Sequence, residues 1–367
     1  MSIPDKIYGS VVDSLPSLSG KCYAITGCTS GTGLWTAIAA ARKGAACLLL
    51  LNRRSDRAIE AENQVKAASS TTKVISVDCD LQSFASVRVA ATQVKAIATE
   101  YGGLDGLINN AGVMAVPDTR TIDGHDVQMQ TNHLSHFLLT SLLMPALEEA
   151  AIARSESRVI QHSSGARGPR SGSTDLESRF FGVSESGSLG GDDTSDCFIR
   201  YHQTKLANSV FAMALHHKLQ AAGSRVKSLC AEPGVSATSL MVNMAAGHAS
   251  APKPERKKDE SKQGRRAPSF NFKPQSAADG ACPLIEASFG ASSHSGDFFM
   301  PGDLDEGTPV GMAVKCMTAG TPTPTSDFMK KSFQNEELTM SVANHTLLWT
   351  ESEKATGPFQ LGRSSKL

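Results

Sequence analysis

The stretch KCYAITGCTSGTGLWTAIAAAR, residues 21–42, decides the fold class of this 367-residue chain. It begins with a short apolar run, Cys22–Thr26, passes through Gly27, Gly31 and Gly33, and enters a segment with helical spacing of its apolar residues. A buried strand that turns through glycines into a helix is typical of a parallel sheet whose strands are joined by helices. The sequence therefore predicts an α/β fold.

The glycine-rich turn differs from the usual dinucleotide fingerprint. Its spacing is Gly-x3-Gly-x-Gly, whereas the fingerprint is Gly-x-Gly-x2-Gly. Glycines at such a turn let the backbone approach a pyrophosphate, which free N–H groups and the helix dipole hold. The alternative is that they only permit close packing of the helix. We predict a cofactor site that contains Gly27, Thr29, Ser30, Gly31 and Gly33.

The alternation of short apolar runs with helix-like segments continues to about residue 245. Buried strands with helices on both faces form a doubly wound, mostly parallel Rossmann sheet, whose ligand binds beyond the carboxyl ends of the strands. We predict one domain over residues 1–367. The predicted strands are Cys22–Thr26, Ala46–Leu51, Lys73–Val77, Gly106–Asn109, Arg158–His162 and Val226–Cys230, and the predicted helices are Leu34–Arg42, Phe84–Tyr101, His125–Ala150 and Tyr201–Leu219.

Two stretches interrupt this alternation. Residues 166–195 are rich in Gly, Ser and Asp and have no sustained apolar period, which predicts a surface insertion. Residues 247–275 are rich in Lys, Arg, Pro and Ser and bury too little apolar area to offset their ordering entropy, which predicts a disordered insertion. The alternative is an ordered arm that caps the ligand site and attracts a phosphate-bearing substrate such as an acyl-CoA.

Composition limits the partners. The 36 basic residues balance the 36 acidic ones, which argues against nucleic acid or an acidic membrane surface as the main partner. The eight cysteines form no CxxC pair or zinc-type spacing, which predicts reduced, mostly buried thiols. His133 and His136 lack companion ligands, so we predict no metal site.

The two ends of the sequence bear on location. Residues 1–20 contain no apolar run long enough for a signal peptide or a membrane span, so we expect no transmembrane segment. Residues 363–367 end with Ser365, Lys366 and Leu367, the tripeptide that the peroxisomal import receptor recognises. We predict a peroxisomal location, and a cytoplasmic one if this tail is only unstructured chain.

The end of the second predicted strand indicates which cofactor is bound. Asn52, Arg53 and Arg54 stand about where NAD-binding folds carry an acidic residue for the ribose hydroxyls. A carboxylate there would repel a 2′-phosphate, whereas a guanidinium can bind one through two hydrogen bonds. NADP(H) is therefore the predicted cofactor. Alternatively, the arginines are solvated residues past the strand end.

Two further groups follow strands. Asp80 could place a carboxylate beside an adenine amino group, or it could cap the helix that begins near Ser83. Asn109, Asn110, Ala111 and Gly112 end the fourth strand with small residues where the cofactor would lie. Neither group is diagnostic alone.

Tyr201 and Lys205 are the strongest candidates for chemistry. Their i, i+4 spacing places both side chains on one face of a helix. An ammonium near a phenol favours the phenolate and lowers the phenol pKa from about 10 toward that of a general base. A surface helix pair would show the same spacing.

Ser164 and Asn132 complete the candidate catalytic set. Ser163 and Ser164 follow the fifth strand, where a hydroxyl can donate to a substrate carbonyl, although a serine pair there is also a turn signal. Asn132 lies within a predicted helix that it disfavours. Its amide could face solvent, or it could bind a water that connects Lys205 to bulk solvent.

Taken in order, these motifs strongly resemble the short-chain dehydrogenase/reductase family, over about Leu18–Leu240 and weakly again near residues 347–353. The residues Asn132–Leu139 and Tyr201–Asn208 look most like its retinol-dehydrogenase-like branch. The motifs that carry the resemblance are Thr26-Gly27-x3-Gly31-x-Gly33, Asp80, Asn109–Gly112, Asn132, Ser164, Tyr201-x3-Lys205 and Pro233-Gly234.

The resemblance implies a role for each residue. Tyr201 would be the general acid/base, Lys205 would lower its pKa and bind the nicotinamide ribose, and Ser164 would orient the carbonyl. Asn132 would hold a relay water, and its helix would contribute to a homo-oligomer. Two departures concern the substrate. Tyr201 stands 37 positions after Ser164, and the basic insertion falls where the family keeps its mobile substrate loop.

We therefore predict an NADP(H)-dependent oxidoreductase that interconverts a carbonyl and an alcohol, with a hydrophobic aldehyde or ketone as the small-molecule substrate. A peroxisomal reductase of keto- or enoyl-acyl-CoA is the alternative among enzymes. An NADPH-sensing binding protein without turnover is the alternative from another class. The intact set of Asn132, Ser164, Tyr201 and Lys205 argues against the latter.

Overall fold

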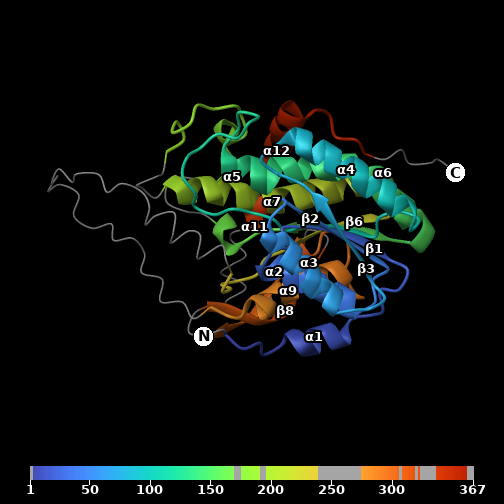
Figure 1. Ribbon diagram of the computed structural model, residues 1–367. Helices are drawn as coiled ribbons and strands as arrows, with labels where there is room; N and C mark the ends of the chain where they lie inside the picture. Colours follow the sequence, from blue (N-terminus) through green and yellow to red (C-terminus); the bar gives the residue numbers. More distant parts are fainter. Residues whose placement is uncertain are drawn as a thin grey trace.

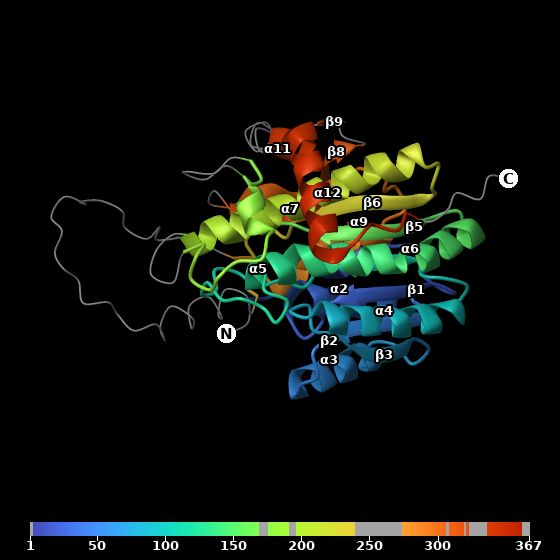
Figure 2. The same ribbon diagram turned by 90° about the horizontal axis from the view of Figure 1, so that it is seen from above.

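The computed structural model describes residues 3–168, 175–190, 196–238, 274–305, 308–318, 321–322 and 336–361. These residues form one nine-stranded sheet in the order β3-β2-β1-β4-β5-β6-β7-β8-β9, which Figure 2 shows from one edge to the other. Strands β1 to β7 are parallel, while β8 and β9 are antiparallel additions at one edge. The strands are β1 Cys22–Thr26, β2 Cys47–Asn52, β3 Lys73–Asp78, β4 Gly106–Asn109, β5 Ser157–His162, β6 Val226–Ala231, β7 Phe298–Asp305, β8 Thr308–Thr318 and β9 Thr321–Pro322.

Helices cover both faces of this sheet (Figure 1). One face carries α1 Tyr8–Ser14, α2 Gly31–Arg42, α3 Asp56–Ala67 and α9 Ala277–Phe289. The other carries α4 Phe84–Thr99, α6 Ser135–Arg154, α7 Asp196–Ala221 and α12 Val342–Thr356, together with the short helices α5 Val127–Met129 and α11 Glu336–Met340. The doubly wound fold class is confirmed.

Side chains of the central strands alternate between two cores. In β1, Cys22 and Ala24 pack on the α4/α6 side, whereas Tyr23 and Ile25 pack on the α2/α9 side. Successive side chains of a strand point to opposite faces, so a run that is apolar throughout indicates a sheet covered twice. The six predicted strands are confirmed with ends within one residue.

The C-terminal helix α12 completes one of these cores. Trp349 of α12 lies against Phe137 of α6, with the ring centroids 5.3 Å apart. Phe359, three residues beyond the helix, lies 5.0 Å from the same phenylalanine ring and 4.9 Å from Trp349. A main-chain N–H at Gln360 donates to Ser141 Oγ at 2.8 Å. Residues 342–361 are thus part of the domain.

The predicted surface insertion 166–195 contributes to the core. Leu176, Phe180 and Phe181 are buried in the same cluster as α4, α6 and α7. Helix α7 begins at Asp196, five residues before its predicted start at Tyr201. Residues 169–174 and 191–195 lie outside the described part.

Two other predicted segments fall mostly or wholly outside the described residues. Of the predicted disordered insertion 247–275, only residues 274 and 275 are described, and Gln275 donates its main-chain N–H to Val235 O at 3.0 Å. The tripeptide Ser365–Leu367 is not among the described residues. The alternatives for both segments therefore stay open.

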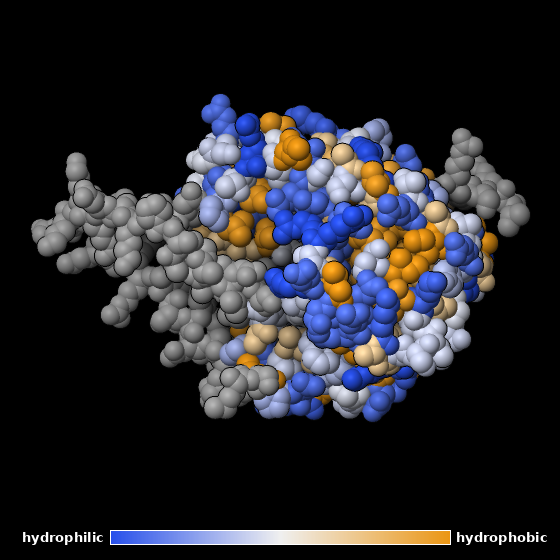
Figure 3. All heavy atoms as spheres, in the orientation of Figure 1, coloured by the Kyte–Doolittle hydropathy of each residue, from blue (hydrophilic) through white to orange (hydrophobic). Residues whose placement is uncertain are grey.

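The predicted helix His125–Ala150 consists of α5, a π-helical turn at Gln130–Leu134, and α6. Together they span Val127–Arg154, which has the length and apolar character of a membrane span, but 67% of its most apolar window is buried inside the domain. Core helices pass the same test of length and composition. Figure 3 shows small apolar groups separated by hydrophilic side chains on the face that it presents.

Seven of the eight cysteines have described side chains. All seven are buried, and none of them forms a disulfide. The prediction of buried thiols is confirmed for these residues.

Candidate active site

The glycine turn between β1 and α2 packs directly on the end of β4. Gly27 has φ +71°, and a Cβ on it would lie 2.7 Å from Ala111 Cα. A Cβ on Gly33 would lie 2.3 Å from Asn110 Nδ2 and 2.5 Å from Gly27 O. Gly31 has φ +63°, in the left-handed region that favours glycine. Close packing accounts for Gly27 and Gly33, and it also brings the backbone of the turn near the predicted cofactor residues.

Asn110 fixes this junction by neutral hydrogen bonds. Its Nδ2 donates to Thr26 O at 2.8 Å and Gly27 O at 3.1 Å. Its Oδ1 accepts from Thr32 Oγ1 at 2.9 Å and pairs with His162 Nδ1 at 3.0 Å. All of these groups are buried or half-buried, so the turn is held before any ligand arrives.

Thr26 and His136 connect the turn to the helix of Asn132. His136 Nδ1 lies 3.0 Å from Asn132 O, which can only accept, so this nitrogen carries the hydrogen. Burial lowers the pKa of His136 to about 4, which leaves Nε2 as an acceptor for Thr26 Oγ1 at 2.9 Å. Thr26 Oγ1 in turn accepts the main-chain N–H groups of Asn110 and Ala111, each at 3.0 Å.

At the end of β2, the three predicted residues have different surroundings. Asn52 is buried, and its Oδ1 accepts Cys28 N–H at 2.7 Å, so it holds the glycine turn. Its Nδ2 has no hydrogen-bond partner among the described residues. The exposed Arg54 pairs with Asp78 at 3.1 Å. The Arg53 side chain is exposed and makes no ion pair with any described residue.

Arg57 is a residue that the sequence analysis missed. It lies in the first turn of α3, and its Nη2 donates to Ser30 Oγ at 3.2 Å. Ser30 is the N-cap residue of α2. The signal was the run Asn52-Arg53-Arg54-Ser55-Asp56-Arg57, where a third guanidinium follows a helix cap.

The remaining predicted cofactor residues lie at carboxyl ends of strands. Asp80 Oδ1 accepts Gln82 N–H at 2.9 Å, whereas Ser83 is the residue that caps α4. The capping alternative for Asp80 is therefore wrong. Asn109 Nδ2 donates to Thr140 Oγ1 at 3.0 Å in the interior. After β6, Pro233 O accepts Gln275 Nε2 at 2.7 Å, and Gly234 has φ +61°.

The structure brings Lys205, Asn132 and Gly112 together. Lys205 Nζ donates to His162 O at 2.9 Å and lies 5.8 Å from the centroid of the Tyr201 ring. A Cβ on Gly112 would lie 3.2 Å from Asn132 Oδ1 and 3.5 Å from Lys205 Nζ. The segment after β4 therefore lies directly against the ammonium of Lys205 and the amide of Asn132.

Lys205 is a buried ammonium group. Burial lowers its pKa to about 8. An isolated surface lysine would show no such shift, so the surface-pair alternative for Tyr201 and Lys205 is wrong; Tyr201 is buried as well. Strongly shifted pKa values cluster at functional sites.

Asn132 sits in the π-helical turn, a feature that often marks functional positions. Its Oδ1 accepts Val113 N–H at 2.8 Å, and its Nδ2 donates to Val113 O and to Thr204 Oγ1, each at 2.9 Å. The amide is buried rather than solvent-facing. Because both amide hydrogens are already donated, Asn132 can bind a relay water only as an acceptor, through its side-chain or main-chain oxygen.

The two serines after β5 differ. Ser163 is buried and donates to Lys205 O at 2.7 Å, so it holds α7. Ser164 is half-buried and caps the short helix Gly165–Arg167 by accepting Ala166 N–H at 3.2 Å. Its hydroxyl donates to no acceptor among the described residues, which agrees with the choice of Ser164 over Ser163.

A buried charge cluster beside Ser164 was not predicted. Arg167 donates to Ser164 O at 3.0 Å and forms ion pairs with Glu232 and Glu336. Its guanidinium carbon also lies 4.4 Å from the centroid of the Phe298 ring. Burial raises the pKa of the Glu232 carboxyl. The residues come from three distant segments, so no local pattern indicates them.

The two histidines considered as metal ligands have other partners. His133 Nε2 pairs with Ser352 Oγ at 2.8 Å, and His136 pairs with Thr26 and Asn132. Among the described residues, no group of three or more His, Cys, Asp or Glu side chains is arranged to hold a metal ion.

Comparisons with known proteins give the family. A family model described as short chain dehydrogenase matches residues 21–172. Polyprenol dehydrogenase from Mus musculus is 34% identical over 226 residues, which cover 62% of this chain and 63% of that protein. Retinol dehydrogenase 12 from Bos taurus is 33% identical over 237 residues, which cover 64% of this chain and 67% of that protein.

A crystal structure of an uncharacterized protein from Mycobacterium Paratuberculosis has the same fold. It superposes with a TM-score of 0.62 and 28% identity, covering 95% of this chain and 98% of that one. The chain matches just under two thirds of the polyprenol dehydrogenase. Together with the glycine turn and the order of Asn132, Ser164, Tyr201 and Lys205, these matches establish that the chain belongs to the short-chain dehydrogenase/reductase family, in its retinol-dehydrogenase-like branch.

Proposed function

We propose that this protein is an NADP(H)-dependent oxidoreductase that interconverts a carbonyl and an alcohol, with a hydrophobic aldehyde or ketone as substrate. The observation that carries the proposal is the burial of Lys205 one helical turn after Tyr201, beside Asn132 and Gly112. The relatives named for polyprenol and retinol favour a hydrophobic substrate.

The residues at the edge of β1 and β2 fit a dinucleotide. The glycine turn has no room for side chains at Gly27 and Gly33, and Asn52 Nδ2 is a buried donor without a partner among the described residues. Solved proteins of this fold were crystallised with NADP, from Burkholderia cenocepacia, and with NADH, from Brucella melitensis, so the fold accepts both. Arg53 and Arg57 favour the 2′-phosphate.

When bound, the nicotinamide supplies the hydride that reduces the carbonyl carbon. Tyr201 donates its phenolic proton to the carbonyl oxygen, and Lys205 stabilises the phenolate that remains. A pKa of about 8 keeps Lys205 largely charged at neutral pH. Ser164 donates a hydrogen bond to the same oxygen and orients it. In the reverse direction, the Tyr201 phenolate removes the alcohol proton.

The test is NADPH oxidation with a panel of aldehydes, ketones and acyl-CoA esters, using wild type, Tyr201→Phe and the control Tyr101→Phe. We expect turnover of hydrophobic carbonyls, a fall in kcat of about 10²- to 10⁴-fold for Tyr201→Phe, and wild-type rates for the control. Tight NADPH binding without any turnover would instead support the sensing protein. Turnover confined to acyl-CoA esters would support the acyl-CoA reductase.

Location and assembly are part of the proposal. Ser365-Lys366-Leu367 supports import into peroxisomes, and a fluorescent fusion whose peroxisomal location does not change on deletion of this tripeptide would refute that role. A homo-oligomer through the Asn132-containing helix is proposed on the resemblance. Phe359 and Gln360 of the same chain cover part of α6. Sedimentation of the protein with and without residues 357–361 therefore tests whether α6 forms the interface between two copies.

A further inference from the structure

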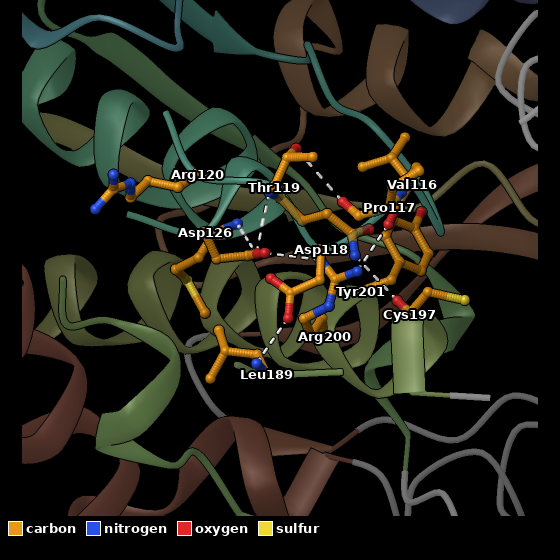
Figure 4. A network of polar contacts seen from close by, with 12 residues as sticks. Val116, Pro117, Asp118, Thr119, Arg120, Asp126, Leu189, Cys197, Arg200 and Tyr201 are labelled. Carbon is orange, nitrogen blue, oxygen red and sulfur yellow. Dashed lines mark hydrogen bonds and ion pairs between the residues drawn. The ribbon is translucent and has the colours of Figure 1, made fainter. Parts of the chain in front are cut away.

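A buried ion pair lies directly beside the catalytic tyrosine. Arg200, the residue before Tyr201 in α7, places Nη1 2.7 Å from Asp126 Oδ2, and each side chain is 1% exposed (Figure 4). Neither residue belongs to the catalytic set described above.

Asp126 connects this pair to the helix of Asn132. Its Oδ1 accepts the N–H groups of Gln128 at 3.1 Å and Met129 at 2.9 Å, so it caps α5. Helix α5 continues into the π-helical turn that holds Asn132. The ion pair therefore joins the start of one catalytic helix to the residue next to Tyr201 in the other.

The other donors of Arg200 hold two loop segments. Nη2 donates to Val116 O at 2.7 Å, and Nε donates to Gly190 O at 2.9 Å. Asp118 Oδ2 joins the same segments, since it accepts Leu189 N–H at 2.6 Å and Gly190 N–H at 2.7 Å. One guanidinium thus contacts α5, the segment after β4 and the segment after β5 (Figure 4).

Both segments follow the carboxyl ends of strands, where this class of sheet binds ligands. Residues 116–118 come after β4, and residues 187–190 come between Ser164 and Tyr201 in the chain. A planar guanidinium offers five donors in a fixed fork, so it can satisfy three acceptors in one plane, whereas a lysine ammonium cannot.

We propose that Arg200 and Asp126 are positioning residues, which set Tyr201 against Asn132 and hold residues 116–118 and 187–190 as one wall of the substrate site. This inference rests on the proposed function. A buried ion pair adds little net stability compared with apolar residues of similar size, so a role in placing side chains explains it better than stability does.

The experiment compares Arg200→Lys with Arg154→Lys. Arg154 forms an ion pair with Asp105 that is less buried than that of Arg200. It lies at the amino ends of the central strands, where Asp105 also accepts Cys22 N–H at the start of β1. We expect Arg200→Lys to lower kcat and raise KM for the carbonyl, each about tenfold or more, with unchanged NADPH affinity. Arg154→Lys should change only the unfolding midpoint.

A second measurement needs no turnover. The ultraviolet pH titration of wild type minus that of Tyr201→Phe isolates the Tyr201 phenol, and we expect Arg200→Lys, but not Arg154→Lys, to shift it. The double variant Arg200→Met/Asp126→Leu removes both charges without leaving one unpaired, and it should fold while keeping the defect in kcat.

The outcomes separate the two hypotheses. An inactive wild type whose Tyr201 titration shifts in Arg200→Lys would refute the proposed function and keep the positioning role. Wild-type kcat, KM and Tyr201 titration in a folded Arg200→Lys protein would overturn the inference, even if the unfolding midpoint falls.

Discussion

The two sides of the active site are held by different forces. The cofactor side, residues 22–112, is fixed by close backbone contacts and neutral hydrogen bonds around Gly27, Gly33 and Asn110. The substrate side comprises the described residues beyond 112 at the carboxyl ends of the strands. There, buried ion pairs of Arg167 and Arg200 join distant segments.

This difference explains why the cofactor side can be recognised from the sequence and the ion pairs of the substrate side cannot. A glycine turn is contiguous and can be recognised from its spacing. The partners of Arg167 lie 65 and 169 residues away, and Asp126 lies 74 residues from Arg200. Buried charges are also costly when a partner is lost, so the two sides should respond differently to substitution.

The largest expected effect on stability is that of Arg167→Met. It would leave the Glu232 and Glu336 carboxyls without their shared buried cation, so we expect the free energy of unfolding to fall by about 3–5 kcal/mol. Arg179→Met is the control, because Arg179 pairs with Glu177 at the surface, where a pair contributes about 0–1 kcal/mol. Urea denaturation measures the free energy of unfolding of both variants. Equal losses would show that the buried ion pairs of Arg167 contribute no more than the surface pair of Arg179.

Substitutions of the arginines beside the glycine turn test how positive charge contributes to cofactor binding. Arg53→Ala and Arg57→Ala should each raise KM for NADPH about tenfold, since a hydrogen bond to a charged group contributes about 1.5–3 kcal/mol. KM for NADH should not change. Arg54→Ala tests the third arginine, and we expect it to raise KM for NADPH by a smaller factor, because Arg54 also pairs with Asp78. If wild type and every variant turn over equally well with NADH and with NADPH, the assignment of NADP(H) is wrong.

Gly33→Ala tests the close backbone contact itself. The new Cβ would meet Asn110 Nδ2 and Gly27 O, and such overpacking costs about 1–3 kcal/mol. We also expect weaker NADPH binding. Gly9→Ala is the matched control, because Gly9 lies in α1 with nothing within 4 Å of the added atom. A Gly33→Ala protein with wild-type stability and NADPH affinity would contradict the packing account.

The smallest expected effect is a pH dependence on the substrate side. Burial raises the folded-state pKa of Glu232 above its ordinary value of 4.5. Such a carboxyl favours folding below its unfolded pKa, and this contribution is lost as pH rises through the folded pKa. Relative to Glu232→Gln, the wild type should therefore lose unfolding free energy as pH rises above the ordinary glutamate pKa of 4.5. A difference in unfolding free energy that does not change with pH would refute the raised pKa.

The sequence predicted the fold and the main site residues for identifiable reasons. The six strands were found because each contains a short apolar run between helix-like segments, as in Leu48–Leu51 of β2. Tyr201, Lys205, Ser164 and Asn132 were chosen because they stand in a recognisable order. Helix α3 was missed because it is mostly polar, and Gln130–Leu134 was predicted as ordinary α-helix because π-helical turns lack a sequence signature. Arg167 and Arg200 could not be predicted, because long-range charge pairing leaves no local periodicity.

The packing of α12 also bears on the order of events during synthesis. Trp349 and Phe359 cover Phe137 and Phe211, which leave the ribosome roughly 140 to 220 residues earlier by the numbering of the chain. Until residues 342–361 emerge, this aromatic surface has no cover and is open to chaperones and to aggregation. The domain thus reaches its final packing only after residues 342–361 have been made.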